Sequence, residues 1–304
     1  MKFEPYLIST EDLNLEALNF IFEKTQYFID NYRPGVKFQD LKDATVALAF
    51  FEPSTRTKSS FELAAKRLSA DVFSFVSAGS SISKGESLSD TIRTIDAMNI
   101  QLYVIRHSLA GVPKTVFEKT NKSVINAGDG KHQHPTQAML DSFTLRQHYG
   151  TTKGLKVCII GDILHSRVAR SNISMLKMQG AEVKLIGPGT LLPKYIIPQT
   201  YDYLDCIEDA IEWADALIVL RLQKERMLEG VLPSLSEFAK FYQVTFEKFT
   251  KKDKIVLLHP GPVNYGIELD YKLSNLHNCL INKQVTNGVF SRMAIMSIVA
   301  NQAR

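Results

Sequence analysis

Short apolar runs alternate with segments of helical periodicity along most of this chain, and this alternation constrains the fold more than any other feature. Strands are predicted at residues 45–51, 70–76, 101–106, 123–127, 155–162, 182–186, 216–220 and 255–258. Helices are predicted at residues 11–31, 59–68, 87–99, 112–119, 135–148, 165–179 and 284–300, with one more ending near Trp213. Such alternation predicts parallel sheets with helices on both faces.

A polar, glycine-bounded stretch at residues 149–154 separates two such series. We therefore predict an α/β fold of two doubly wound parallel-sheet domains joined by helices. The first domain takes residues 1–134 plus 287–304, the second takes residues 150–286, and residues 135–149 form a linking helix. Ligands of such sheets bind outside the carboxyl ends of the strands, so the active site is expected in the cleft between the domains.

Composition argues against several classes of protein. The formal net charge is +4 and the basic residues form no tract, so no nucleic-acid partner is expected. The three cysteines, Cys158, Cys206 and Cys279, match no disulfide or metal-ligand spacing, so no metal is expected. No apolar run approaches membrane-spanning length and no secretion signal is seen. We therefore expect no membrane partner and a cytoplasmic location.

Hydroxyl side chains crowd the turn that follows the first predicted strand. Ser54, Thr55, Arg56 and Thr57 stand shortly before the predicted helix 59–68. The first N–H groups of a helix lack intrahelical partners and lie at the positive end of its dipole. Together with hydroxyls and an arginine, they make a pocket that suits phosphate. An ordinary N-cap explains the same residues, because serine and threonine commonly cap helices.

Polar and cationic side chains follow the other predicted strands. They are Arg106, His134, Gln137, Arg167, Arg221 and Gln223. The arginines suit bidentate binding of phosphate or carboxylate. His134 could stabilise an oxyanion, although a lone histidine is more often structural. Gly161-Asp162 lacks the rest of a dinucleotide fingerprint, so a nicotinamide cofactor is not expected. The arginines and His134 together indicate a reaction that is catalysed by positioning two anions, without a metal or organic cofactor.

Five motifs, in order along residues 52–262, resemble the transcarbamoylase family. They are Ser54-Thr55-Arg56-Thr57, His134-Pro135-Thr136-Gln137, Gly161-Asp162-Ile163-Leu164-His165-Ser166-Arg167, Arg221-Leu222-Gln223-Lys224-Glu225-Arg226 and His259-Pro260-Gly261-Pro262. The last two narrow the resemblance to the members that use aspartate. The resemblance implies carbamoyl transfer from carbamoyl phosphate to the α-amine of L-aspartate, which gives N-carbamoyl-L-aspartate and phosphate in pyrimidine biosynthesis, with no cofactor.

The resemblance also assigns roles to residues. The residues it implies for catalysis are Arg56, Thr57, Lys84, Arg106 and His134. Ser54 and Thr55 would help to hold the phosphate, and Gln137 would hold the carbamoyl amide. The residues implied for the two carboxylates of aspartate are Arg167, Arg221 and Gln223. Backbone carbonyls near Gly261 and Pro262 would contact the ligands, with a cis peptide before the proline.

Residues 80–87 read as a solvated turn from their composition. In the family, however, the serine and lysine of this loop enter the active site of a neighbouring subunit. Ser80 and Lys84 are therefore expected to complete shared sites in a homotrimer, and the sequence leaves regulatory or dihydroorotase chains open. Glu52, Arg167 and Arg226 would form either a charge network that tethers the two halves or plain surface pairs.

Two alternatives stay open at the level of sequence. One is a transcarbamoylase for ornithine or an acylated ornithine, although the cations around Arg221 favour a dicarboxylate. The other is a non-catalytic binding subunit of the same fold, against which the intact Arg56, Lys84 and His134 argue. Tyr265 stands where many relatives have arginine, which bears on the identity of the amine.

Overall fold

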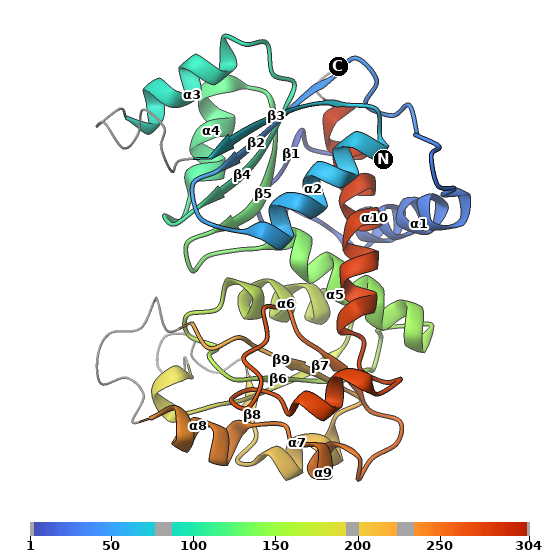
Figure 1. The fold of residues 1–304 in the computed structure, drawn as a ribbon, viewed down its shortest axis with the longest axis vertical. Coiled ribbons are helices and arrows are strands. Elements are labelled where there is room, and N and C mark those ends of the chain that lie inside the picture. The colour runs from blue at the N-terminus through green and yellow to red at the C-terminus, as the bar shows by residue number, and fades with distance from the viewer. Residues whose placement is uncertain (1–2, 77–86, 193–200, 224–233, 303–304) are drawn as a thin grey trace. The chain divides into compact units, whose positions relative to one another are not determined.

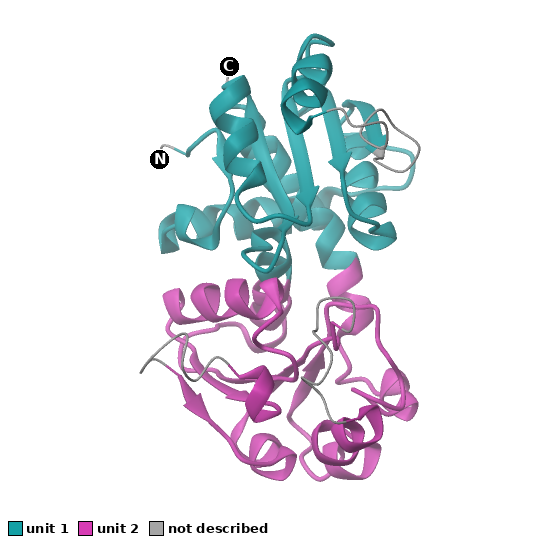
Figure 2. Ribbon diagram, turned by 90° about the vertical axis from the view of Figure 1, so that its left-hand side faces the viewer, with its two compact units in different colours: residues 1–140, 286–304 teal, residues 141–285 magenta. Residues whose placement is uncertain are grey.

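The structure, a computed structural model, describes residues 3–76, 87–192, 201–223 and 234–302 of the 304-residue chain. The chain divides into two compact units (Figure 2). Unit 1 comprises Met1–Leu140 and Thr286–Arg304, and unit 2 comprises Asp141–Val285. The division falls inside two helices, α5 (Pro135–Tyr149) and α10 (Ile281–Ala300), whereas the predicted domain boundaries treat residues 135–149 as a separate linking helix.

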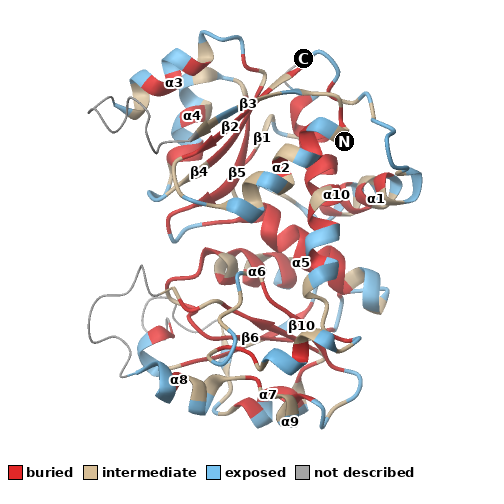
Figure 3. Ribbon diagram, viewed as in Figure 1, coloured by how far each residue is buried: buried red, intermediate tan, exposed pale blue. Residues whose placement is uncertain are grey.

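Unit 1 is built on a five-stranded parallel sheet with the order β1-β5-β4-β2-β3 (Figure 1). Its strands are β1 (Tyr6–Leu7), β2 (Thr45–Phe50), β3 (Asp71–Val76), β4 (Leu102–His107) and β5 (Ser123–Asp129). All of β5 and all of β2 after its first residue are buried (Figure 3). Burial on both faces explains why these strands read as continuous apolar runs.

The helices of unit 1 are α1 (Leu15–Asn31), α2 (Thr55–Arg67), α3 (Leu88–Asp96), α4 (Val112–Thr120), the start of α5 and most of α10. Ile92 of α3 and Val116 of α4 share one buried cluster with Tyr103 and Ile105 of β4. Helices α3 and α4 therefore cover the same part of the sheet.

Helix α10 contacts both α2 and the start of β5. Arg292 Nη1 donates to Ser60 Oγ at 2.9 Å, and its guanidinium lies 5.0 Å from the ring centre of Phe61. Ser123 Oγ, at the start of β5, donates to the carbonyl of Val299 at 3.0 Å. The contacts of Arg292 hold α2 against α10, and the first turn of α2 carries the predicted phosphate-binding residues.

Unit 2 contains a second five-stranded parallel sheet, with the order β10-β9-β6-β7-β8. Its strands are β6 (Lys156–Ile160), β7 (Glu182–Ile186), β8 (Asp202–Tyr203), β9 (Ala216–Val219) and β10 (Val256–Leu258). Its helices include α6 (Arg167–Met178), α7 (Ile207–Trp213), α8 (Leu235–Tyr242) and α9 (Phe246–Phe249). Val157 of β6 packs in a cluster with Ile173 of α6, and its neighbour Cys158 packs in another cluster with Ile211 of α7. Successive residues of β6 therefore face different helical layers.

Both sheets are parallel and covered by helices, so the predicted fold class is confirmed. The local boundaries differ from the prediction. Helix α2 begins at Thr55 rather than at residue 59, and the predicted helix 11–31 is a 3₁₀ turn, Thr10–Asp12, followed by α1, which Asn14 caps. Among the described residues, no helix combines the length and the apolar character needed to cross a membrane.

Candidate active site

The predicted phosphate turn forms the first turn of α2. Ser54 is the N-cap residue by position, but its side chain accepts no hydrogen bond from the helix. The first helical bond runs instead from the N–H of Lys58 to the carbonyl of Ser54. Thr55 and Arg56 are exposed and Thr57 is half-buried. The N–H groups of this turn therefore keep their capacity to bind an anion, and capping by the serine hydroxyl does not account for the motif.

Sheet register brings Arg106 to this turn. Strands β2 and β4 are neighbours, with Phe50 paired to Arg106, and the N–H of Phe51 donates to the carbonyl of Arg106 at 2.8 Å. The guanidinium is oriented by Glu52, whose Oε2 lies 3.3 Å from Arg106 Nε, and by the carbonyl of Ala127, which accepts from Nη1 at 3.3 Å. The predicted network placed Glu52 with Arg167 and Arg226, of which Arg226 lies outside the described residues.

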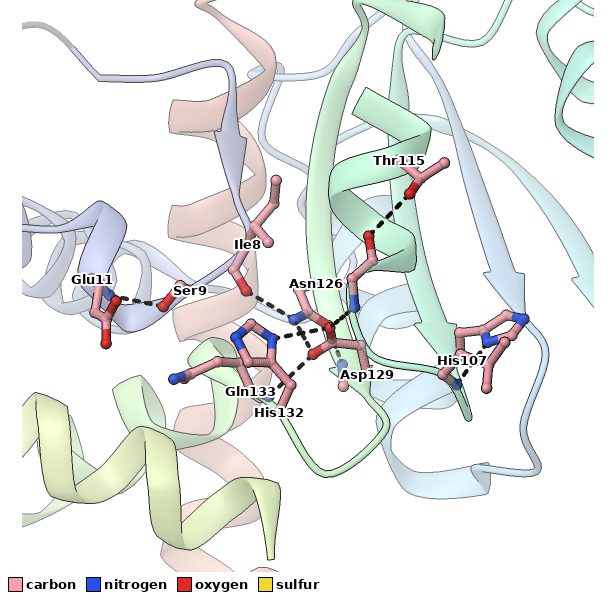
Figure 4. Close-up of polar contacts among 12 residues, drawn as sticks. Ile8, Ser9, Glu11, His107, Thr115, Asn126, Asp129, His132 and Gln133 are labelled. Carbon is pink, nitrogen blue, oxygen red and sulfur yellow. Dashed lines mark hydrogen bonds and ion pairs between the residues drawn. The ribbon is translucent and has the colours of Figure 1, made fainter. Parts of the chain in front are cut away.

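A buried carboxylate, Asp129, organises the loop that leads to His134 (Figure 4). Asp129 Oδ1 accepts from Asn126 Nδ2 at 2.8 Å and from the N–H of Gln133 at 3.1 Å. Asp129 Oδ2 accepts from the N–H of Gly111 at 2.8 Å and lies 3.1 Å from His132 Nδ1. These contacts tie the end of β5 to the start of α4 and to the residue that precedes His134.

His134 stands directly before α5, which begins at Pro135. Its ring is almost fully buried, and Thr136 Oγ1 lies 3.5 Å from Nδ1. Its carbonyl accepts from the N–H groups of Gln137 and Ala138 in the first turn of the helix. Gln137 follows three residues later and is also buried.

A second histidine, His107, lies at the end of β4 beside the phosphate turn. Its ring centre is 5.1 Å from that of Phe51, and its Nδ1 accepts from the N–H of Leu109 at 2.9 Å. Burial lowers the pKa of His107, although the charges of Glu52 and Asp129 act in the opposite direction. His107 therefore adds no positive charge next to Arg106 near neutral pH.

In unit 2, the loop after β6 is folded around Asp162. Gly161 adopts φ +118°, which side-chain-bearing residues rarely adopt. The buried Asp162 Oδ1 accepts from the N–H of His165 at 3.1 Å and lies 2.9 Å from His165 Nδ1, and the backbone N–H of Gln223 also donates to this carboxylate. Burial raises the pKa of Asp162.

Arg167, the first residue of α6, is almost fully buried next to this loop. Ser166 precedes it as the N-cap, and the serine hydroxyl accepts from the N–H of Ala169 at 3.1 Å. In contrast to Ser54, this serine does cap its helix. The cap fixes the start of α6 and hence the place of the Arg167 backbone.

The remaining predicted residues of unit 2 follow two neighbouring strands. Arg221 and Gln223 follow β9 and are half-buried, and Gly261 and Pro262 follow β10. Strands β9 and β10 pair in parallel, so these two segments leave the sheet at the same edge. The peptide Gly261-Pro262 is cis, which confirms that prediction. The unusual Tyr265 is exposed and meets Tyr271 edge to face, with ring centres 5.2 Å apart.

The predicted residues that the structure describes divide between the two units. The set of unit 1 is Ser54, Thr55, Arg56, Thr57, Arg106, His134 and Gln137, and the set of unit 2 is Arg167, Arg221, Gln223, Gly261 and Pro262. Ser80 and Lys84 lie outside the described residues. Over the described part of the chain, no group of three or more histidine, cysteine or acidic side chains is arranged to hold a metal ion. Each set offers donors and cations suited to an anionic ligand.

Sequence reasoning missed the acidic residues that support these sets. Asp129 ends an apolar strand, and a polar residue in such a place is a signal that could have singled it out. Glu268, which is fully buried, follows no predicted strand and carries no comparable signal.

Comparison with known proteins assigns the family. The sequence model of the aspartate/ornithine carbamoyltransferase carbamoyl-P binding domain matches residues 6–147, and that of the Asp/Orn binding domain matches residues 153–299. The aspartate carbamoyltransferase catalytic subunit of Carboxydothermus hydrogenoformans is 47% identical over 97% of this chain and 96% of its own length. The aspartate carbamoyltransferase catalytic subunit of Maricaulis maris is 45% identical over 98% of this chain and 94% of its own length.

Solved structures show the same relationship. Aspartate transcarbamoylase from Trypanosoma cruzi, in complex with carbamoyl aspartate and phosphate, superimposes with a TM-score of 0.88 at 27% identity, over 98% of this chain and 96% of that chain. The catalytic subunit of M. jannaschii aspartate transcarbamoylase superimposes with a TM-score of 0.86 at 32% identity, over 98% of each of the two chains. The chain thus belongs to the aspartate/ornithine carbamoyltransferase family.

Proposed function

We propose that this chain transfers the carbamoyl group of carbamoyl phosphate to the α-amine of L-aspartate, and that the products are N-carbamoyl-L-aspartate and phosphate. The observation that carries the proposal is the arrangement of cations at the strand ends. In unit 1, Arg56 lies in the uncapped first turn of α2, and Arg106 lies on β4, next to the strand that precedes this turn. In unit 2, Arg167 and Arg221 follow strands. Relatives that match almost the whole chain are aspartate carbamoyltransferase catalytic subunits.

The carbamoyl phosphate half of the reaction falls to unit 1. The N–H groups at the start of α2, with the hydroxyls of Ser54, Thr55 and Thr57 and the guanidinium of Arg56, suit the three phosphate oxygens. His134 would donate to the carbamoyl oxygen, together with Thr55 and Arg106, and Gln137 would bind the amide. The buried His134 and its hydrogen-bonded loop give this donor a fixed position, which is what stabilisation of a developing oxyanion requires.

The chemical step is an acyl-type transfer without a covalent enzyme intermediate. The deprotonated amine of aspartate attacks the carbamoyl carbon, a C–N bond forms, and the C–O bond to phosphate breaks. The negative charge that develops on the carbamoyl oxygen is stabilised by His134, Thr55 and Arg106. The proton released by the amine passes to an oxygen of the departing phosphate, and the enzyme supplies positioning and charge.

The aspartate half of the reaction falls to unit 2. Arg167, Arg221 and Gln223 would bind the two carboxylates, with carbonyls near Gly261 and Pro262 as further contacts. Aspartate carries two negative groups, whereas ornithine carries a second amine that carboxylates would have to meet. A predominance of arginine therefore favours aspartate. The T. cruzi enzyme has been crystallised with carbamoyl phosphate and aspartate together.

The proposal extends to assembly and location. By family resemblance, Ser80 and Lys84 complete the site of a neighbouring subunit, so the working form is a homotrimer in the cytoplasm that acts in pyrimidine biosynthesis. The proposal leaves open regulatory or dihydroorotase chains as further partners of this trimer.

A panel of amines tests the proposed function. Carbamoyl transfer is measured with aspartate, ornithine, N-acetylornithine and N-succinylornithine, each at saturating carbamoyl phosphate. An Arg56→Ala chain purified in parallel shows whether any activity comes from a contaminating enzyme. We expect transfer to aspartate alone. Preference for an ornithine derivative would refute the aspartate half, and carbamoyl phosphate binding without transfer to any amine would indicate a non-catalytic binding subunit.

A further inference from the structure

Glu268 is a buried acidic residue behind the predicted aspartate-binding segments. Its side chain has no exposed surface, so it does not itself face a substrate. Glu268 Oε1 accepts from the N–H of Leu222 at 2.8 Å and from Asn264 Nδ2 at 2.6 Å. Glu268 Oε2 accepts from the N–H of Asn264 at 2.7 Å and lies 3.3 Å from His259 Nε2. Both oxygens are therefore engaged by donors from other segments.

The three contacting residues lie on the two segments that follow β9 and β10. Leu222 lies between Arg221 and Gln223, after β9, and is 46 residues from Glu268. His259 directly follows β10, and Asn264 stands two residues after Pro262. One carboxylate thus fixes the backbone on both sides of the predicted aspartate-binding residues.

The ring of His259 is oriented by a second set of bonds. His259 Nδ1 accepts from the N–H of Gly261 at 2.8 Å, so the ring proton is on Nε2, which faces Glu268. The N–H of His259 donates to Gln284 Oε1 at 2.9 Å. His259 therefore links Glu268 to the backbone of Gly261, because one ring nitrogen faces the carboxylate and the other accepts from the Gly261 N–H. The carbonyl of Gly261 is a predicted ligand contact.

The charge of Glu268 is stabilised where it lies. Burial tends to raise the pKa of this carboxyl, but the contact with His259 and the N–H groups of Leu222 and Asn264 lower it, and the net effect is a lowered pKa. The group is therefore a carboxylate at neutral pH, which accepts stronger hydrogen bonds than a neutral acid or amide would.

We propose that Glu268 is a positioning residue for the amine substrate: it holds the segments that carry Arg221, Gln223, Gly261 and Pro262 without touching the substrate. This inference rests on the proposed function in that it takes these residues as the aspartate-binding set. A rigid backbone places the guanidinium and the carbonyls before the substrate arrives, and a small displacement of such groups is costly.

The substitution Glu268→Gln tests the inference, because it preserves size while turning one acceptor oxygen into a donor. At least one N–H of Leu222 or Asn264 then faces an NH₂ group. From the usual cost of losing a hydrogen bond to a charged group, we expect the KM for aspartate to rise about 10- to 100-fold. The KM for carbamoyl phosphate should change by less than about twofold, because unit 1 holds that ligand. Equal changes in both would overturn the positioning role.

Asp215→Asn is the matched control. Asp215 stands directly before β9, at the opposite end of the same strand, and its Oδ2 accepts from the N–H of Lys156 at 2.9 Å. The variant also loses a carboxylate that binds a backbone N–H in unit 2, but it should leave the KM for aspartate unchanged. If the KM for aspartate rose as much in Asp215→Asn as in Glu268→Gln, the effect would be a general result of loosening the sheet, and the inference would be overturned.

Hydrogen exchange gives a readout that needs no substrate. In Glu268→Gln, the amides of Leu222 and Asn264 should exchange faster than in the wild type, while those of β7 stay unchanged. Unchanged exchange at both amides would overturn the inference whatever the enzyme does. If the wild-type chain used an ornithine derivative, the proposed function would fail, yet a raised KM for that amine in Glu268→Gln would support the positioning role.

A milder variant, Asn264→Ala, tests the inference if the Glu268→Gln chain does not fold. Asn264→Ala keeps the carboxylate and removes only the bond from Nδ2, and Asn264 is half-buried. We expect a smaller rise in the KM for aspartate, about 3- to 10-fold, from the loss of one hydrogen bond to a charged acceptor. A wild-type KM in a folded Asn264→Ala chain would count against the inference.

Discussion

Replacing Asp129 by asparagine probes how His134 is held in place. Four donors or ring atoms converge on this buried carboxylate: Asn126 Nδ2, the N–H groups of Gln133 and Gly111, and His132 Nδ1. Asparagine has the same shape but only one acceptor oxygen. If its NH₂ group takes the place of Oδ2, His132 can accept from it, and only Gly111 loses its acceptor. If it takes the place of Oδ1, both Asn126 and Gln133 face a donor.

The less costly orientation sets the expected size of the effect. One buried N–H without an acceptor costs about 1–3 kcal/mol, so the free energy of unfolding should fall by about that amount. Removing an oxyanion donor altogether lowers kcat by about 10²- to 10³-fold in other enzymes. Asp129→Asn keeps His134 but loosens the loop before it, so we expect kcat to fall by about 10- to 100-fold, below that limit.

A double-mutant cycle separates positioning from general loss of stability. Carbamoyl transfer and urea unfolding are measured for Asp129→Asn, His134→Ala and the double variant. If Asp129 acts through His134, it should lower kcat by less than about twofold in the His134→Ala background. The control is Asp96→Asn, because Asp96 Oδ1 accepts from Tyr103 OH at 2.9 Å in the same unit, and its kcat should stay at the wild-type value. An equal loss of kcat in both backgrounds would refute the reasoning.

Further predictions concern the proposed roles of single residues. Arg56→Ala should lower kcat/KM by several orders of magnitude, about 4 kcal/mol or more of transition-state stabilisation, and near-wild-type turnover would remove Arg56 from the phosphate site. Arg221→Ala should raise the KM for aspartate far more than that for carbamoyl phosphate, and equal effects would exclude it as the specificity residue. Mixing Lys84→Ala chains with His134→Ala chains should restore some activity if the sites are shared between subunits, and no recovery after verified subunit exchange would refute shared sites. Because the pKa of Glu268 lies below 4.5, the stability that its carboxylate provides is present above that pH and is lost as the pH falls through the lowered pKa. In acid unfolding, Glu268→Gln should therefore lose less stability than the wild type over that range.

The fold was predictable because strands that are buried on both faces of a sheet appear in the sequence as continuous apolar runs. Residues 157–160 of β6 alternate between two helix-covered faces, and both faces demand apolar side chains. Strands β1 and β8 were missed because each has two residues, which is too short to show any periodicity. Helices α8 and α9, between β9 and β10, were also missed; α9 has only four residues, about one helical turn.

The start of α2 was placed four residues too late for a different reason. Thr55 and Thr57 are β-branched and have weak helix propensity, and Ser54 makes no capping bond. Packing of Phe61, Ala64 and Ala65 into the core determines the helix, and its first turn simply continues it. Ser54, Thr55 and Thr57, which made the start of the helix hard to predict, are also the residues whose hydroxyls suit an anion.

The site was predictable only in part. Arginines that follow strands could be grouped, because parallel strands end at one edge of their sheet. Glu268 could not be grouped in this way, because it binds the N–H of Leu222, 46 residues away in the chain. Asp129 has a local signal, since it ends an apolar strand, but its bond to the N–H of Gly111, 18 residues away, could not be predicted. No local pattern marks a hydrogen bond of such separation.

The way the charges of these acids are compensated explains how the proposed anion-binding residues of each unit tolerate them. Asp129 and Glu268 are surrounded by N–H groups, whose dipoles compensate the negative charge over a few ångströms. Their charge therefore does not have to be balanced by the arginines that are proposed to meet the substrates. Glu52 differs, since it pairs directly with Arg106 at 3.3 Å and is only partly shielded from solvent. It orients that guanidinium but also offsets part of its charge, so among these acids Glu52 is the one that competes with a bound phosphate.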